Sequence, residues 1–149
     1  MALIDLIEEK VVKTPLSGQT KEEIIEELLD LLCASGKVLN REKALKAVMD
    51  RESKGSTGLE DGIAVPHAKT DAVKTLTIAI GIAPQGIAFE ALDGKPSQLF
   101  FLMLAPPDQS GPHIEALAEI ARTTRSKAFC RTLISSQTPS EVVELFQED

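Results

Sequence analysis

The stretch RESKGSTGLEDGIAVPHAKT, residues 51–70, decides how the rest of the chain is arranged. Its first half is a loop with three glycines: Gly55, Gly58 and Gly62. A short apolar run at residues 63–65 follows and predicts a strand. Pro66 cannot donate to a strand ladder and its φ is fixed, so the strand should stop there and leave His67 at its end.

His67 is one of only two histidines and is the candidate nucleophile. Its unperturbed pKa would leave the imidazole largely neutral, and therefore nucleophilic, near pH 7. The glycines, together with Ser56 and Thr57, suit a loop whose backbone N–H groups and hydroxyls hold an oxyanion. These features favour a histidine that faces a phosphoryl group. The alternative is a strand-end histidine that only bonds its neighbours.

The segment GSTGLEDGIAVPHAKT resembles the active-site motif of phosphotransferase-system IIA components, in the branch that holds the fructose, mannitol and nitrogen-regulatory types. The similarity continues through residues 89–94, 99–106 and 113–118. The resemblance implies a phosphotransferase component in which His67 forms a phosphohistidine. The phosphoryl group would come from a phosphocarrier protein and pass to a IIB component. In regulatory members it would act as a signal.

Further groups could stabilise a phosphoryl group on His67. Arg51 ends a predicted helix, and its guanidinium could make a bidentate pair with phosphoryl oxygens. His113 falls in the first turn of another helix, where anions collect and a histidine tends to stay neutral. The resemblance assigns such roles to the matching arginine and second histidine. Ser56 and Thr57 could donate hydroxyl or backbone hydrogen bonds, a role that rests on chemistry alone.

Both assignments have simpler alternatives. An arginine near a helix C-terminus can be a dipole partner or half of a surface ion pair, and this is the alternative for Arg51. A histidine at a helix start can be an ordinary surface residue, and this is the alternative for His113.

Helical and strand patterns interleave and predict an α/β fold. Residues 1–19 read as a short helix or turn and an extended piece, and the predicted strands are residues 63–65, 76–83, 87–92 and 98–105. Helices are predicted to open at Thr20, Asn40, residues 110–112, Lys127 and Thr138. Asp93-Gly94 predicts a hairpin, which makes a sheet of about four or five strands mixed. The resemblance implies a three-layer α/β/α sandwich.

Two of these elements carry finer expectations. Residues 98–105 are apolar almost throughout, as in a central strand buried on both faces. The helix that opens at residues 110–112 should have Pro112 at its first position. Its buried stripe should consist of four apolar residues: Ile114, Leu117, Ile120 and Ala121.

Length and composition narrow the class of protein. The 149 residues predict one domain, residues 1–149, and a net charge of −7 argues against nucleic acid or anionic membrane as a partner. Five Phe without Trp or Tyr give no stacking platform for bases. No 18-residue apolar run and no signal-peptide layout occur, so the protein is expected to be cytoplasmic.

Cys33 and Cys130 are expected to be reduced core residues.

No cofactor or metal is expected. The sequence lacks the histidine and cysteine spacings of zinc sites, the G-x-S-x-G elbow of serine hydrolases and a Walker A loop. Two functions stay open. The segment PHAK resembles the fructose branch, which implies a phosphoryl carrier that passes phosphate from His67 to a IIB component. Residues 129–133 resemble the nitrogen-regulatory branch, which implies a protein that controls partners by its phosphorylation state.

Overall fold

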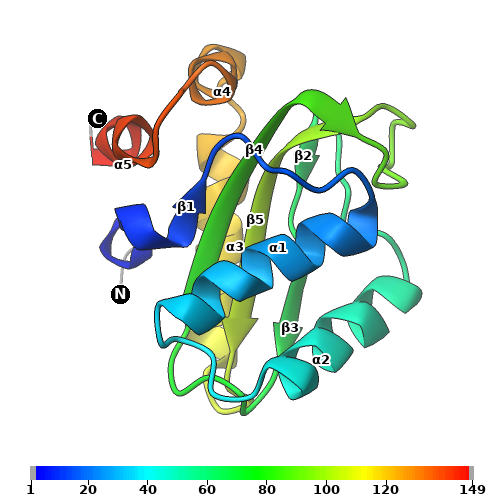
Figure 1. The fold of residues 1–149 in the computed structure, drawn as a ribbon, viewed down its shortest axis with the longest axis vertical. Helices are drawn as coiled ribbons and strands as arrows, with labels where there is room; N and C mark the ends of the chain where they lie inside the picture. The colour runs from blue at the N-terminus through cyan, green and yellow to red at the C-terminus, as the bar shows by residue number, and fades with distance from the viewer. Residues whose placement is uncertain (1–2, 148–149) are drawn as a thin grey trace.

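The computed structural model describes residues 3–147, which form a mixed sheet covered by helices on both faces (Figure 1). The strands are β1 (Val12–Lys13), β2 (Ile63–Ala64), β3 (His67–Lys69), β4 (Thr77–Ile87) and β5 (Ser97–Ala105). The helices are α1 (Lys21–Ala34), α2 (Arg41–Ser53), α3 (Ser110–Thr123), α4 (Lys127–Ile134) and α5 (Pro139–Gln147), preceded by the 3₁₀ turns η1 (Leu3–Leu6) and η2 (Glu9–Val11).

The sheet order is β1-β4-β5-β2, with β3 also paired to β5. Only the β4–β5 hairpin is antiparallel, while β1, β2 and β3 pair in parallel. The predicted mixed α/β sheet is therefore confirmed. Strands β2 and β3 run one after the other along the same side of β5, at the edge of the sheet.

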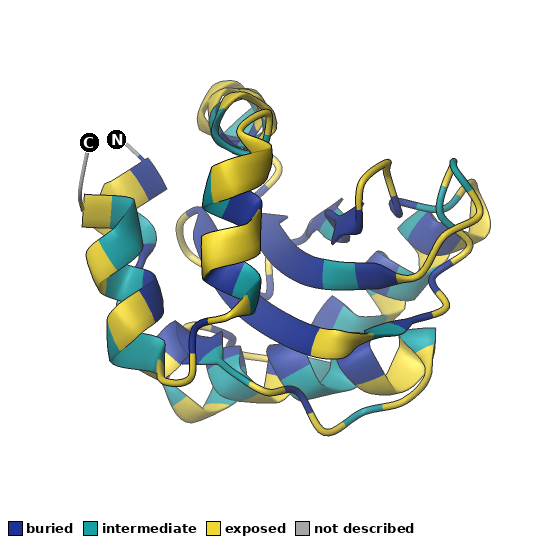
Figure 2. Ribbon diagram, turned by 90° about the horizontal axis from the view of Figure 1, so that it is seen from above, coloured by how far each residue is buried: buried dark blue, intermediate teal, exposed yellow. Residues whose placement is uncertain are grey.

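Two hydrophobic cores, one on each face, make the fold a three-layer sandwich. α1 and α2 pack on one face, and α3, α4 and α5 with the N-terminal turns cover the other (Figure 2). β5 contributes Phe100 and Leu102 to the first core and Phe101 and Met103 to the second. The predicted central strand, buried on both faces, is confirmed.

Three helices begin at the capping residues predicted from the sequence. Thr20 Oγ1 accepts from Glu23 N at the start of α1, and Asn40 Oδ1 accepts from Lys43 N at the start of α2. Thr138 Oγ1 accepts from Glu141 N before α5. Each bond satisfies one of the N–H groups that lack a partner in the first turn of a helix.

Two strand predictions need correction. Residues 88–92 do not form a strand, because the backbone of this segment bonds the glycine loop: Leu92 N donates to Gly58 O at 3.1 Å. The strand predicted over residues 63–65 ends one residue early, because β2 stops at Ala64, and pairing resumes after Pro66, so that His67 begins β3 instead of ending a strand. The Pro66 carbonyl still accepts from Met103 N at 3.0 Å, which keeps the ladder in register across the interruption.

The predicted stripe of α3 is partly wrong. The helix begins at Ser110, so Pro112 is its third residue, and its buried residues are His113, Ala116 and Ile120. Ile114 is 65% exposed and Ala121 is also exposed. The sheet covers a narrower strip of the helix than its apolar residues span, which leaves Ile114 facing outward.

The two cysteines pack on opposite faces of the sheet as free thiols, Cys33 beside the first core and Cys130 inside the second. Within residues 3–147, no helix is long and apolar enough to cross a membrane.

Candidate active site

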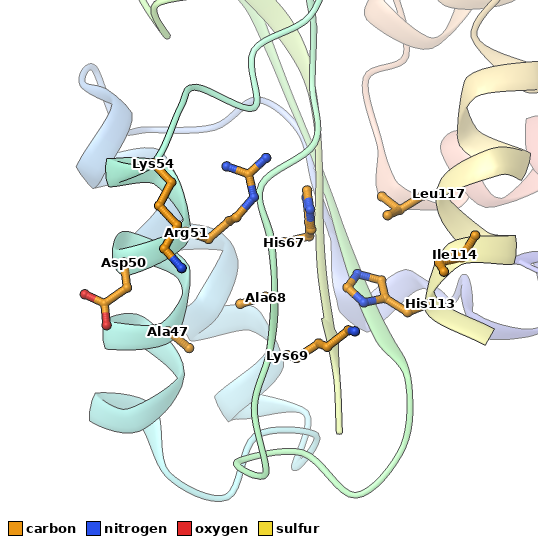
Figure 3. A pocket seen from close by; sticks show the side chains of 10 residues that line it. All are labelled: Ala47, Asp50, Arg51, Lys54, His67, Ala68, Lys69, His113, Ile114 and Leu117. Carbon is orange, nitrogen blue, oxygen red and sulfur yellow. The ribbon is translucent and has the colours of Figure 1, made fainter. Parts of the chain in front are cut away.

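His67 lies where the two helical layers meet at the open edge of the sheet. In β3 it pairs with Met103, which belongs to the core under α3, whereas Ala68 pairs with Leu104 of the core under α2. The alternation of a strand therefore turns His67 and Lys69 toward the α3 side. The C-terminal end of α2 reaches the same edge from the other layer (Figure 3).

The tautomer of His67 follows from one hydrogen bond. Nδ1 lies 2.8 Å from the carbonyl oxygen of Val65. A carbonyl can only accept, so Nδ1 carries the proton in the neutral ring. Nε2 is left with its lone pair, which is the state a nitrogen nucleophile needs.

His113 faces His67 from the first turn of α3. The ring centroids are 5.5 Å apart and the planes meet at 75°. His113 is only 4% exposed, and its pKa is lowered to about 4, first by burial and then by electrostatic repulsion of the charged form by the neighbouring His67 and Lys69. It is therefore neutral at pH 7. Its buried Nε2 has no hydrogen-bond partner in the described part of the chain.

Arg51 in the last turn of α2 presents its guanidinium to the same place, and Figure 3 shows it beside the His67 ring. Nη1 donates to Gly55 O at 2.8 Å, which holds the side chain over the glycine loop. One edge of the fork bonds Gly55, so the remaining N–H donors are available to an anion.

A cavity of about 580 Å³ opens around the two histidines. It is lined by Ala47, Asp50, Arg51, Lys54, His67, Ala68, Lys69, His113, Ile114 and Leu117. Three of its side chains are cationic and one, Asp50, is anionic, although the protein as a whole is acidic. Lys54 and Lys69 form no ion pair with any residue between positions 3 and 147. The local charge therefore suits a dianionic group.

Ser56 and Thr57 lie beside Arg51 and His67 in a second, smaller cavity of about 220 Å³. Their hydroxyls already have acceptors. Ser56 Oγ donates to Phe89 O at 2.7 Å, and Thr57 Oγ1 donates to the carboxylate of Glu52. The structure thus brings all five predicted residues together, with these two holding the loop in place.

Glu52 and Lys21 were not among the predicted residues. Glu52 is a buried carboxylate that accepts from Lys21 Nζ at 2.7 Å and from Thr57. A signal was present in the sequence: Glu52 continues the Ala44 and Val48 stripe of α2 at a spacing of four, a position where a charge needs a partner.

Among residues 3–147, no group of three or more His, Cys, Asp or Glu side chains could hold a metal ion.

The sequence is similar to proteins of a known family. Residues 5–149 match the family described as Phosphoenolpyruvate-dependent sugar phosphotransferase system, EIIA 2. The chain belongs to this family. The resemblance inferred from the motif is confirmed, and the EIIA 2 family is a family of phosphotransferase components.

Proteins similar to this chain carry two kinds of name. The fructose-specific EIIA component of Haloferax volcanii is 37% identical over 129 residues, covering 87% of this chain and 84% of that protein. The nitrogen regulatory protein of Klebsiella oxytoca is 32% identical, covering 99% and 91%. The fructose-specific EIIABC component of Bacillus subtilis is 30% identical over 99% of this chain, but the chain spans only 23% of its length.

Solved structures share the fold over nearly the whole chain. The nitrogen regulatory protein IIA-Ntr of Neisseria meningitidis superposes with a TM-score of 0.88 at 28% identity, covering 96% of this chain and 97% of that one. The mannitol IIA of Escherichia coli, solved in complex with phosphorylated mannitol IIB, gives a TM-score of 0.82 at 23% identity, covering 96% and 98%. The second likeness concerns the fold alone.

Proposed function

We propose that this chain is a phosphoryl carrier of a phosphotransferase system, which accepts a phosphoryl group on His67 from a phosphocarrier protein and passes it to a IIB component of the fructose type. The observation that carries the proposal is the hydrogen bond of His67 Nδ1 to Val65 O, because it leaves Nε2 unprotonated at the cavity. A phosphocarrier donor also fits the predicted cytoplasmic location.

The bonds formed and broken in the transfer balance without a metal or cofactor. The lone pair of His67 Nε2 attacks phosphorus in line with the donor's N–P bond, a new N–P bond forms, and the bonding pair returns to the donor nitrogen. His67 keeps its Nδ1 proton, and its positive ring charge is stabilised by the Val65 carbonyl. Passage to the IIB component is the same displacement in reverse, with the IIB nucleophile attacking phosphorus.

Arg51 and His113 stabilise the moving group from opposite sides. The free guanidinium donors of Arg51 bind phosphoryl oxygens. His113 is neutral at pH 7, and its Nε2, which has no partner among the described residues, forms a hydrogen bond with the same phosphoryl group. Ser56 and Thr57 support the site by fixing the glycine loop, and their backbone borders the second cavity.

Label mapping tests the proposal. The protein is incubated with radiolabelled phosphoenolpyruvate, the general phosphotransferase enzyme and the phosphocarrier protein. We expect acid-labile label on His67 and none on His67→Ala. The control is His113→Ala, which should take label slowly on His67. Acid-stable label, or label retained in His67→Ala, would contradict the proposal.

A regulatory role is the second candidate, because the Neisseria meningitidis IIA-Ntr structure superposes with a TM-score of 0.88. It would use the same phosphohistidine as a signal. Mixing the phosphorylated protein with the IIB domains of its organism separates the two. Transfer to a IIB side chain supports the relay. No transfer, together with a partner that binds only one phosphorylation state, supports regulation.

A further inference from the structure

An ion pair between the buried Glu52 and the mostly buried Lys21 lies behind the active-site loop. Lys21 Nζ, from the first residue of α1, is 2.7 Å from Glu52 Oε2, and the two side chains are only 18% and 3% exposed. Lys21 also lies 4.9 Å from the centre of the Phe89 ring. Its second carboxylate neighbour, Glu90, is 3.3 Å away but 80% exposed. Glu52 is therefore the principal partner of Lys21, since an exposed ion pair contributes little.

Thr57 links this pair to the loop. Glu52 accepts from both the hydroxyl and, at 3.3 Å, the backbone N–H of Thr57, which is itself buried. Both hydrogen-bond donors of Thr57 are thus held by a single carboxylate. The adjoining Gly55 carbonyl accepts from Arg51, so the loop is fixed on either side of Ser56.

From Thr57 the contacts continue to the nucleophile. Val65 N donates to Thr57 O at 3.0 Å, and Val65 O accepts from His67 Nδ1 at 2.8 Å. The carbonyl that selects the tautomer of His67 therefore belongs to a residue anchored on Thr57. Lys21, Glu52, Thr57, Val65 and His67 form one continuous series of polar contacts.

We infer that Glu52, paired with Lys21, is a positioning residue that fixes the Nδ1–H tautomer and the orientation of His67 through Thr57 and Val65. The consequence for phosphoryl transfer rests on the function proposed above, whereas the tautomer does not. A nucleophile misplaced by about 1 Å can lose about 10²-fold in rate. Removing the contact of Glu52 with Thr57 should therefore slow transfer, although every residue that touches the phosphoryl group is still present.

The test uses a double variant, because Glu52→Leu alone removes the principal partner of the mostly buried Lys21 and leaves it only the exposed Glu90, so that this single variant can fail to fold. Lys21→Met with Glu52→Leu replaces the pair by apolar side chains of similar size, a change that is often neutral or stabilising. The variant keeps the layer packing but removes the anchor of Thr57. Glu90→Gln is the matched control, since it removes the exposed carboxylate beside the same lysine.

Two readouts are compared on the full chain labelled with ¹⁵N-histidine. Two-bond ¹H–¹⁵N spectra at alkaline pH report the tautomer of His67. Rapid-quench assays report the rate of phosphorylation by the phosphocarrier protein. We expect the wild type and Glu90→Gln to hold the Nδ1–H form. The double variant should show a tautomer mixture and a transfer rate lower by roughly 10-fold to 10²-fold. It should still unfold cooperatively, at a lower melting temperature, because the buried N–H and hydroxyl of Thr57 lose their acceptor.

A double variant that keeps the Nδ1–H form and transfers at the wild-type rate would overturn the inference. Failure of the proposed function gives a different result: the wild type itself takes no label, while the tautomer of the double variant still shifts.

Discussion

At the residue scale, the two histidines are made different by their surroundings. His67 has a carbonyl acceptor for one nitrogen and an open cavity for the other. His113 is buried, faces His67 and Lys69, and has a pKa lowered to about 4. One imidazole is thus suited to attack phosphorus, and the other to remain neutral beside it.

The lowered pKa of His113 predicts a pH dependence of stability. Between pH 6.5 and about 4, the unfolded chain binds a proton at this residue that the folded chain does not, so the free energy of unfolding should fall as the pH falls through this window. The loss is at most about 3 kcal/mol. Urea unfolding at several pH values measures it. His113→Gln should lack this component, and an identical pH slope in both proteins would disprove the assignment.

Arg51 gives a second prediction at this scale. Lysine in its place keeps the charge but cannot both bond Gly55 O and present a fork to the phosphoryl group, so Arg51→Lys should slow phosphorylation by roughly 10²-fold to 10³-fold. Rapid-quench assays with the phosphorylated donor measure this. Arg131→Lys, on the exposed side of α4, is the control and should transfer normally. A normal rate of phosphorylation in Arg51→Lys would show that bidentate binding by the Arg51 guanidinium is not needed for transfer.

At the scale of the element, Gly58 of the glycine loop packs too closely against Phe89 and Ala91 to accommodate a Cβ. A Cβ on Gly58 would lie 2.9 Å from Ala91 Cα and 3.0 Å from Phe89 O. Because these are backbone atoms, Gly58→Ala should cost about 1–3 kcal/mol of stability and disturb the loop that carries Thr57. Thermal and urea unfolding measure this cost.

Gly111→Ala is the control for that substitution. No heavy atom lies within 4 Å of a Cβ at Gly111, which is near the start of α3, so this change should leave stability nearly unchanged. Equal effects of the two substitutions would show that crowding at Gly58 is not the cause.

The elements also show where sequence reasoning succeeds. Caps at Thr20 and Asn40 and the apolar run of β5 depend on near neighbours in the chain, and these predictions are confirmed. Exposure of Ile114 depends on how much of α3 the sheet covers, and the role of Glu52 depends on a lysine 31 positions away that only folding brings to it. Local patterns do not contain such information.

At the scale of the whole molecule, the site exists because the chain is layered. Arg51 comes from the α2 layer, His113 from the α3 layer and His67 from the edge strand between them (Figure 3). No single element carries two of the three groups. The cavity also has exposed apolar side chains at its border, with Ile114 65% exposed and Leu59 at the second cavity, and such surface suits contact with another protein.

This arrangement predicts the kind of ligand that the domain recognises. Phosphorylation of His67 adds about −1.5 to −2 charges at the cationic cavity of a protein whose net charge is −7. A partner that distinguishes the two states must do so by differential binding, and its population shift is limited by that difference. We therefore expect a second protein to bind one phosphorylation state more tightly, and no tight binding of a free sugar. Calorimetry with free hexoses tests the second part, with His67→Ala as control. Submicromolar affinity for a hexose would mean that the cavity is a substrate pocket instead of a protein-facing carrier site.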